Sequence, residues 1–189
     1  MIATLYDKFK PWSEKGSVWI ISDTHFDDTD CKFMDPGWIT PKEQMNILKN
    51  MCHKNDTLIH LGDVGDASYL DELKCYKVLI SGNHDILSKV ASHFDEVYTG
   101  PLFIADRILL SHEPIKGLED FCLNIHGHDH SNVVMCFNEN CKRVTHLNLA
   151  CNISNYTPIN LGKIIKEGFL SGTQNYHRIT IDKASEREK

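Results

Sequence analysis

The sequence lacks any apolar run long enough to span a lipid bilayer, and residues 1–12 lack the apolar segment of a secretory signal. We therefore expect a cytoplasmic protein with no membrane-spanning segment. Internal repeats and low-complexity segments are also missing. The 189 residues are 41% hydrophobic, which is enough to bury one sizeable core, so we expect a single domain over residues 1–189.

A disulfide framework is missing as well. The seven cysteines are odd in number and scattered along the chain, which favours reduced thiols. Cys136 and Cys141 bracket an expected hairpin tip and could pair or bind zinc. No second Cys or His pair stands at a matching spacing, so a purely structural role is favoured for both.

Excess positive charge is the third absence, because the formal net charge is -6. This balance argues against a broad electrostatic grip on a nucleic-acid backbone. It does not exclude a single phosphoryl group, since bound metal ions would change the local charge. Two divalent ions add about +4, which two aspartates and one hydroxide reduce to about +1.

Short apolar runs and helical patterns alternate in the first half of the chain, which predicts a parallel sheet with right-handed crossovers. The expected strands are 17–22, 57–61 and 76–81, and the expected helices are 41–53, 68–73 and 86–93. In the second half strands dominate. They are expected at 96–98, 102–105, 107–111, 121–126, 132–137 and 143–149, followed by a helix at 159–167, a strand at 176–181 and a frayed tail at 183–189.

The segments between these elements carry signals of their own. Residues 1–16 form a polar lead-in without a clear period, and residues 26–40 form a long charged loop. Thr40 followed by Pro41 predicts the start of a helix, with Thr40 as its N-cap.

Polar clusters follow five of the apolar runs. They are Asp23-Thr24-His25, Gly62-Asp63-Val64-Gly65-Asp66, Gly82-Asn83-His84-Asp85, Ser111-His112-Glu113 and Gly127-His128-Asp129-His130. Each cluster stands just past the carboxyl end of an expected strand, where ligand sites gather in open α/β sheets. Carboxylate oxygens, imidazole nitrogens and an amide oxygen suit Mn, Fe, Zn or Ni. The pattern predicts two ions about 3.5–4 Å apart that hold a phosphate.

Taken singly, each cluster has a plainer explanation. Asp23 could only cap a turn, and a Gly-Asn-His sequence is often just a tight turn. Their joint occurrence in step with the strands favours a functional site. Outside the clusters we expect His53, His93 and His177 at the surface, and His60 and His126 buried and hydrogen-bonded, with hydrogen bonding to the ligand residues as their alternative. Trp38 is expected in packing, and Trp38 and Phe33 could instead stack on a flat ligand.

The ordered clusters resemble those of the calcineurin-like metallophosphoesterase superfamily, and more narrowly its small bacterial and phage members. Ser22–Phe26, His60–Asp63, Leu110–Pro114 and Tyr156–Leu161 match stretches typical of these proteins, and the similarity covers about residues 17–166. This resemblance implies an α/β fold, a four-layer α-β-β-α sandwich of two mixed β-sheets flanked by helices.

The resemblance also implies residue roles. The implied ligands of two divalent ions are Asp23, His25, Asp63, Asn83, His112, His128 and His130. Asp63 would bridge the ions. Asp23 and His25 would bind the first ion with His130 completing its site, and Asn83, His112 and His128 would bind the second. His84 would bind no metal, but would protonate the leaving oxygen or stabilise the transition state. Asp66 and Asp85 could orient ligand imidazoles. Mn and Fe are expected first, with Zn or Ni as alternatives.

Two positions depart from the pattern of the small relatives. The chain reads Asp27-Asp28-Thr29-Asp30 where many continue with Gly-His, and Asp129 stands where a Ser or Thr is usual. Both changes add negative charge near the expected site, which would repel a polyanion more than a small ester.

Together these features predict a metal-dependent phosphoric ester hydrolase. We expect a phosphodiesterase, monomer or homodimer, that hydrolyses a small phosphate ester or nucleotide through a hydroxide shared by the two ions. A nuclease acting on DNA or RNA is the first alternative, which the acidic balance disfavours. A binding module that has lost catalysis is the second, and it is disfavoured because the ligand set and His84 are complete.

Overall fold

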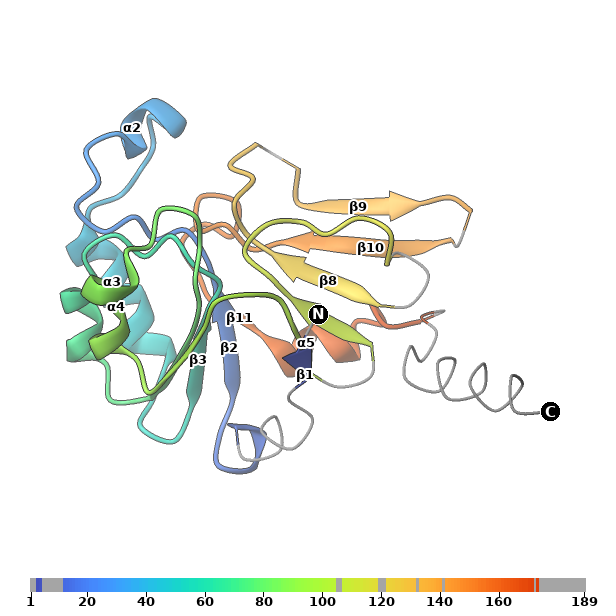
Figure 1. The fold of residues 1–189 in the computed structure, drawn as a ribbon, viewed down its shortest axis with the longest axis horizontal. Coiled ribbons are helices and arrows are strands. Elements are labelled where there is room, and N and C mark those ends of the chain that lie inside the picture. The colour runs from blue at the N-terminus through green and yellow to red at the C-terminus, as the bar shows by residue number, and fades with distance from the viewer. Residues whose placement is uncertain are drawn as a thin grey trace.

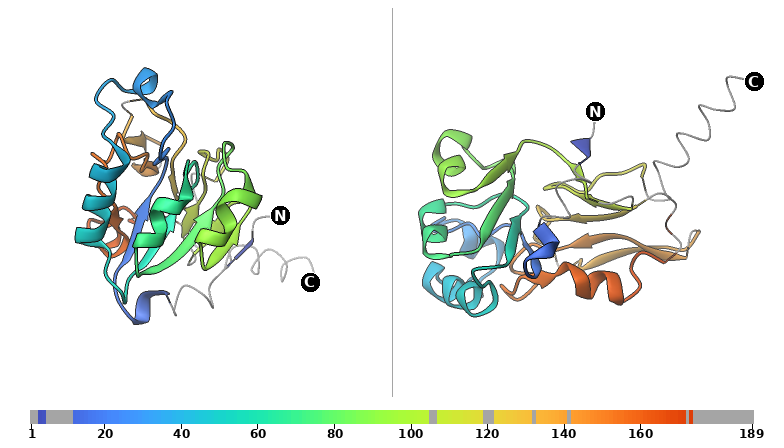
Figure 2. Two further views of the ribbon diagram at one scale, coloured as in Figure 1. Left: turned by 90° about the vertical axis from the view of Figure 1, so that its left-hand side faces the viewer. Right: turned by 90° about the horizontal axis from the view of Figure 1, so that it is seen from below.

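The computed structural model describes residues 3–4, 12–104, 107–118, 122–131, 133–140, 142–171 and 173. Two mixed β-sheets pack face to face and helices flank them, which confirms the expected fold class (Figures 1 and 2). No helix in these described residues is both long and apolar enough to cross a bilayer.

The first sheet has five strands in the spatial order β11-β2-β3-β4-β5. They are β11 (Ile159–Asn160), β2 (Val18–Ile21), β3 (Thr57–His60), β4 (Tyr76–Ile80) and β5 (Glu96–Tyr98). Strands β2 to β5 run parallel, as the alternating pattern predicts, and β11 is antiparallel to β2. The helices between them are α3 (Pro41–Met51), the 3-10 helix η1 (Ala67–Glu72), α4 (Leu87–Val90) and the 3-10 helix η2 (Ala91–His93).

The second sheet has six strands in the spatial order β1-β6-β7-β8-β10-β9. They are β1 (Ala3–Thr4), β6 (Leu102–Phe103), β7 (Ile108–Leu110), β8 (Leu123–His126), β10 (Arg143–Asn148) and β9 (Met135–Asn138). Strands β7, β8 and β10 are mutually parallel, whereas β9 forms an antiparallel hairpin with β10. The carboxyl ends of β7, β8 and β10 therefore share one edge.

Two apolar layers hold the sheets and helices together. Between the sheets, Ile20 and Ile59 pack with Leu110 and Ile125, and all four are essentially inaccessible to solvent. On the other face of the five-stranded sheet, Leu48 and Leu70 from the helical connections pack against Leu58 and Leu79. Figure 1 shows α3 and α4 on this outer side of β2 and β3, with β8, β9 and β10 on the opposite side.

Helix α3 begins where the sequence predicts. The Thr40 side chain accepts from the Glu43 backbone N–H and the Glu43 carboxylate accepts from the Thr40 N–H, so a capping box with Pro41 at the first turn starts the helix. Buried Gln44 on the same helix donates to the Thr24 carbonyl oxygen at 3.1 Å. The helix thus holds the loop that follows β2.

Several sequence expectations need correction. The helix expected at 159–167 begins as strand β11, and its helical part, α5, spans Leu161–Lys166. The expected lead-in contains strand β1, which pairs with β6, and the loop expected at 26–40 contains a short helix, α2 (Cys31–Met34). Two- and four-residue elements are set by the neighbours they pair with, so they leave no period in the sequence. The strand expected at 176–181 and the tail lie outside the described residues.

The two sheets meet at the carboxyl ends of β2 and β10. The Ser22 N–H donates to the Leu149 carbonyl at 3.1 Å, and the Cys151 N–H donates to the Ser22 carbonyl at 2.9 Å. Loops from both sheets therefore converge on one edge of the molecule. Six of the seven cysteines are described, and all six are free thiols.

Candidate metal centre

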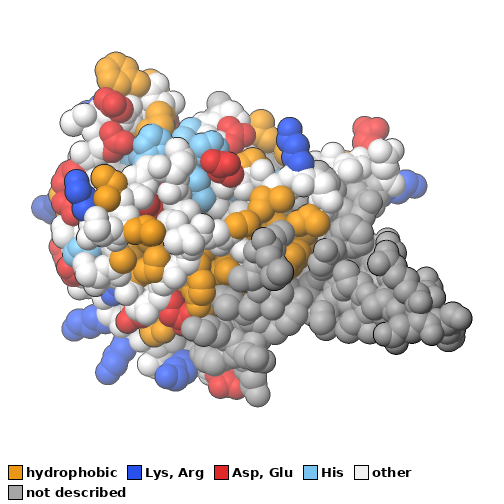
Figure 3. Space-filling view, viewed as in Figure 1, with side chains coloured by type: hydrophobic (Ala, Val, Ile, Leu, Met, Phe, Trp, Pro, Cys, Tyr) orange, Lys and Arg blue, Asp and Glu red, His pale blue; other side chains and the backbone are white. Residues whose placement is uncertain are grey.

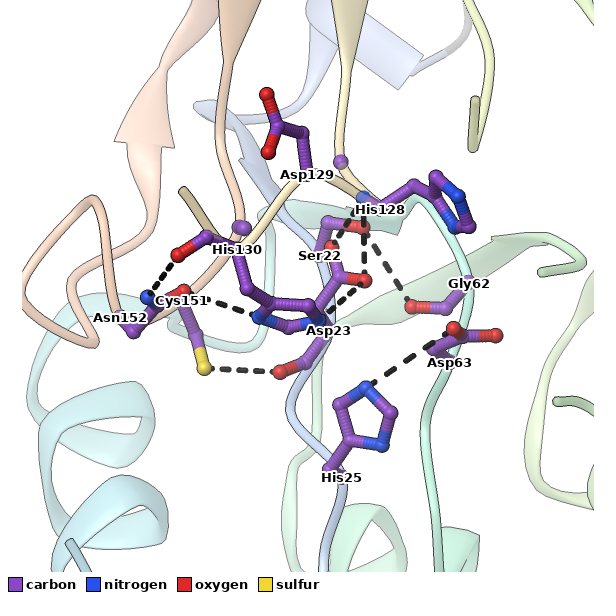
Figure 4. A network of polar contacts seen from close by, with 12 residues as sticks. Ser22, Asp23, His25, Gly62, Asp63, His128, Asp129, His130, Cys151 and Asn152 are labelled. Carbon is purple, nitrogen blue, oxygen red and sulfur yellow. Dashed lines mark hydrogen bonds and ion pairs between the residues drawn. The ribbon is translucent and has the colours of Figure 1, made fainter. Parts of the chain in front are cut away.

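Seven predicted ligands come together at the edge where the two sheets meet. They form two groups, which we call the first donor cluster (Asp23, His25 and His130) and the second donor cluster (Asp63, Asn83, His112 and His128). Figure 4 shows Asp23, His25, Asp63 and His130 gathered from loops that belong to different sheets. This grouping is the one that the family resemblance implies, and the fold brings its members together from distant parts of the chain.

The second donor cluster is tightly spaced. The Nε2 atom of His112 lies 2.8 Å from Asn83 Oδ1, 3.2 Å from His128 Nδ1 and 3.2 Å from Asp63 Oδ2. His128 Nδ1 is 3.1 Å from the same Asn83 oxygen. An octahedral ion with bonds of about 2.1 Å keeps adjacent ligand atoms about 3.0 Å apart. These four donors therefore already stand at the separations of ligands around one small divalent ion.

The first donor cluster is wider. His130 Nε2 lies 3.5 Å from Asp23 Oδ1, and the three donor atoms of the cluster are within 4.8 Å of one another. His25 Nε2 is buried and has no hydrogen-bond partner in the described structure. An unpaired imidazole nitrogen in a buried position is costly unless something binds it. A divalent ion among these three side chains would satisfy that nitrogen, so the residues fit a metal.

Asp63 belongs to the second donor cluster and also faces the first. Its Oδ1 accepts from the His84 backbone N–H at 2.9 Å, which fixes the carboxylate. Its Oδ2 faces His112 Nε2 at 3.2 Å on one side and His25 Nε2 at 3.9 Å on the other. One carboxylate oxygen thus points to both groups of donors.

The loops that carry these donors have unusual backbones. Asp23, His25, Asp63 and His128 all have positive φ values, between 43° and 65°. This left-handed conformation costs about 1 kcal/mol or more for a residue other than glycine, and it is concentrated at functional sites. Parallel hydrogen bonds from Asp23 and His25 N–H to the carbonyls of Gly62 and Asp63 hold two of these turns side by side.

Gly127 makes a close approach possible at the edge of the second sheet. A Cβ atom there would overlap the Ser22 hydroxyl and the Asp23 carboxylate. The absence of a side chain lets the His128 N–H donate to both Asp23 carboxylate oxygens, at 3.1 and 2.9 Å. This contact ties the loop after β8 to the loop after β2.

Within the described part of the chain Asp85 and Asp66 accept no hydrogen bond from an imidazole, so the expectation that they orient ligand imidazoles is wrong. The Asp85 carboxylate accepts from the backbone N–H groups of Asp63, Val64 and Gly82 at 2.9–3.0 Å. It therefore fastens the turns after β3 and β4 to each other. The Asp66 carboxylate accepts from the Ser68 N–H and caps η1.

Three other groups hold the imidazoles, and sequence reasoning missed them. His112 Nδ1 donates to the Leu61 carbonyl at 2.9 Å, and His130 Nδ1 donates to Asn152 Oδ1 at 3.2 Å. His25 Nδ1 lies 3.1 Å from Asp28 Oδ2. The sequence marked only Asp28, as a departure from the pattern of relatives, and it could not show where that carboxylate points.

Burial and neighbouring charges shift the pKa values of the donors in the metal-free protein. Burial raises the pKa of Asp23 and lowers that of His25. Burial also opposes ionisation of Asp63, but hydrogen bonds from His112 and the His84 N–H outweigh it and lower the pKa of Asp63 to about 2. Burial lowers the pKa of His112, but the carboxylates of Asp63 and Asp23 outweigh burial and raise this pKa above its ordinary value.

His84 and Trp38 border the donors. The His84 side chain is exposed at the mouth of the site, and its ring centroid lies 5.8 Å from that of His25. Trp38 is 9% exposed and packs by its edge against His25 and at an angle against His130, which agrees with the expected packing role. Phe33 on α2 is 88% exposed and does not contribute to the core.

The remaining histidines lie outside both clusters. His60 and His126 are buried and hydrogen-bonded, as expected, and His53 is exposed. His93 is half-buried and pairs with Asp71, while His177 lies outside the described residues.

The surface over the donors combines histidines with acidic side chains. In Figure 3 pale-blue histidine side chains gather on the face seen, with red acidic side chains beside them. Acidic residues close to the donors in the sequence include Asp27, Asp28, Asp66, Asp85, Glu113 and Asp129, and all of these are partly or fully exposed.

The family model described as calcineurin-like phosphoesterase matches residues 16–185. The chain belongs to the calcineurin-like phosphoesterase family. It is therefore a metal-dependent phosphoric ester hydrolase, as the sequence predicts. No curated protein matches this phosphoesterase.

Two solved structures resemble this phosphoesterase. A protein of unknown function from Aquifex aeolicus is 27% identical with a TM-score of 0.64, and the match covers 80% of this chain and 98% of that one. The nuclease MPE of Pseudomonas putida is 18% identical with a TM-score of 0.44, and that match covers 70% of this chain and 74% of the nuclease. The first supports the fold, and neither carries information about the substrate of this chain.

Proposed function

We propose that this phosphoesterase is a phosphodiesterase that acts on a small phosphate ester or nucleotide with two divalent ions. The observation that carries the proposal is the position of Asp63 Oδ2, which faces His112 at 3.2 Å and His25 at 3.9 Å. A carboxylate that serves two donor groups at once is suited to hold two cations while offsetting their repulsion. The seven residues of the two donor clusters would be the ligands, and Mn or Fe are the favoured ions.

The bound ions would supply positive charge for the phosphate and lower the pKa of water, so that a nucleophile is available at neutral pH. The chain supplies the remaining functions. Asn83 is a neutral ligand, which adds no negative charge to the site and leaves it attractive to an anion. His84, anchored through its backbone N–H to Asp63, would protonate the leaving oxygen.

The surroundings of the centre favour a small substrate over a nucleic acid. The exposed carboxylates of Asp27 and Asp66 and the half-buried Asp129 lie close to the donors, and they would repel the successive phosphates of a polymer. A groove of about 520 Å³ is lined by Asp129 and by residues of β9, whose Met135 and Phe137 side chains are exposed. This volume is typical of small-molecule sites, and the groove would take the organic part of an ester.

A metal-replacement assay tests the proposal. The purified protein is stripped with EDTA, and hydrolysis of bis-p-nitrophenyl phosphate, p-nitrophenyl phosphate and single-stranded DNA is measured after Mn, Fe, Zn or Ni is added. We expect metal-dependent hydrolysis of the diester. Faster turnover of DNA would favour the nuclease, and bound metal without hydrolysis of any substrate would favour a binding module.

A further inference from the structure

The second side of the His25 imidazole distinguishes it from the other histidines of the centre. His112 Nδ1 donates to a backbone carbonyl, and His130 Nδ1 donates to the neutral amide of Asn152. His25 Nδ1 instead lies 3.1 Å from a carboxylate oxygen of Asp28. Of these three described Nδ1 partners, Asp28 is charged, whereas the Leu61 carbonyl and the Asn152 amide are neutral.

The turn from His25 to Asp28 is built to bring that carboxylate back over the ring. The Asp28 N–H donates to the His25 carbonyl at 3.0 Å, and His25 and Asp27 both adopt positive φ values, 43° and 59°. The Asp28 Oδ1 atom accepts from the Asp30 N–H at 2.9 Å, which leaves Oδ2 directed at the imidazole. The Tyr69 hydroxyl donates to Asp27 Oδ2 at 2.9 Å and anchors the turn to η1.

We propose that Asp28 is a positioning residue for the first donor cluster, acting through His25, and this inference rests on the proposed function. By accepting the Nδ1 proton, Asp28 keeps the lone pair of His25 on Nε2, the buried nitrogen that has no hydrogen-bond partner among the described residues and faces Asp63 at 3.9 Å. A carboxylate behind a ligand histidine fixes the tautomer and ring orientation and raises the basicity of the ligand nitrogen.

The proposal predicts an effect on one ion and not on both. Asp28 contacts His25 but no member of the second donor cluster. Loss of its charge should therefore weaken the ion held by Asp23, His25 and His130 by about 10- to 100-fold, the range for outer-sphere partners of metal ligands. The ion held with His112 and His128 should keep its affinity.

The test is a manganese titration of the metal-free protein by calorimetry, with the parent, Asp28→Asn and Asp30→Asn. Asp28→Asn keeps the shape of the side chain and removes its charge. Asp30→Asn is the matched control, because Asp30 carries the same charge two residues away and its side chain makes no cap hydrogen bond. We expect two ions in the parent and the control, and one strong and one weakened ion in Asp28→Asn. Hydrolysis by Asp28→Asn should recover as the manganese concentration rises.

Other outcomes would overturn the assignment. Two ions of unchanged affinity in Asp28→Asn, equal weakening of both ions, or hydrolysis that excess manganese does not restore would each contradict it. Cys31 also lies near Asp28 and His25, within 4.8 Å between donor atoms. A third ion in the parent that is lost in both Cys31→Ser and Asp28→Asn would make Asp28 a ligand and not a positioning residue. A parent that binds no ion would instead contradict the proposed function itself.

Discussion

The two donor clusters differ in how completely the fold prepares them. In the second cluster the donor atoms of Asn83, His112 and His128 already lie 2.8–3.2 Å apart. In the first cluster the distance from His130 Nε2 to Asp23 Oδ1 is 3.5 Å, and the buried nitrogen of His25 has no hydrogen-bond partner in the part of the chain that the structure describes. The second cluster is therefore closer to the geometry of a bound ion than the first.

The difference follows from what holds each side chain. The His112 ring is held by the Leu61 carbonyl directly after β3, and Asn83 lies in a turn fastened by Asp85. The first cluster depends on Asp28 and Asn152, which are side chains on loops from different sheets. A side-chain partner has more freedom than a strand backbone, so a site built on loops keeps more freedom of adjustment. One centre can thus combine a preformed ion position with an adjustable one.

Replacing Asp63, the member of the second cluster that also faces the first, should have the largest effect. In Asp63→Asn the oxygen that faces His112 and His25 loses its charge, so both ions should weaken and turnover should fall by more than about 100-fold, the upper limit for an outer-sphere partner. Metal content after dialysis and diester hydrolysis measure this. Loss of only one ion would show that Asp63 belongs to the second cluster alone.

A change outside both clusters should separate chemistry from metal binding. His84→Ala should retain both ions and slow turnover by about 10²–10⁴, the range for a general acid. The effect should shrink for an ester whose leaving group needs no proton, such as p-nitrophenolate, compared with an alkoxide. Equal activity of parent and variant on the alkyl ester would contradict the role given to His84.

The free energy of unfolding of the metal-free protein should depend on pH because of the buried His60. The His60 ring is hydrogen-bonded to the Thr24 hydroxyl and to the Gly62 N–H, and burial lowers the pKa of His60 to about 4. The unfolded chain binds a proton near pH 6.5, so between pH 6.5 and 4 it binds more protons than the folded protein. Stability should therefore fall as the pH falls through this window, by up to about 3 kcal/mol.

Urea unfolding of the metal-free protein at several pH values from 6.5 to 4.5 measures this dependence. His60→Gln should unfold more easily at every pH but show a weaker dependence on pH. His53→Gln, at an exposed position, serves as the control and should keep the parent slope. Identical slopes for the parent and His60→Gln would assign the dependence to other groups.

The smallest effect is expected at a carboxylate beside the centre that contacts neither cluster. Asp66→Ala removes the cap of η1 and should lower the free energy of unfolding by about 1 kcal/mol. Manganese affinity and turnover should remain within about twofold of the parent, since no donor contacts Asp66 in the described structure. A large loss of either would restore a role for Asp66 in orienting the ligands.

Much of the fold could be predicted from the sequence. The apolar runs before Asp23, Asp63 and Asn83 predicted parallel strands ending at one edge, and the Thr40-Pro41 signal placed the start of α3. The short elements β1, α2 and β11 could not be predicted, because pairing and packing partners decide them. The roles of Asp85 and Asp28 were missed for the same reason, since a carboxylate in a loop can face a backbone amide, an imidazole or water.

The sequence by itself determined the kinds of ligand, their order and the ends of the strands that carry them, because strand patterns and donor chemistry are local properties. The family resemblance implied which donors share a cluster and that Asp63 serves both, but only the packed structure set the distances between those donors and placed a carboxylate behind His25. These facts depend on distances between residues as far apart as Asp23 and His130, and such distances are fixed only when two sheets pack and their edges meet.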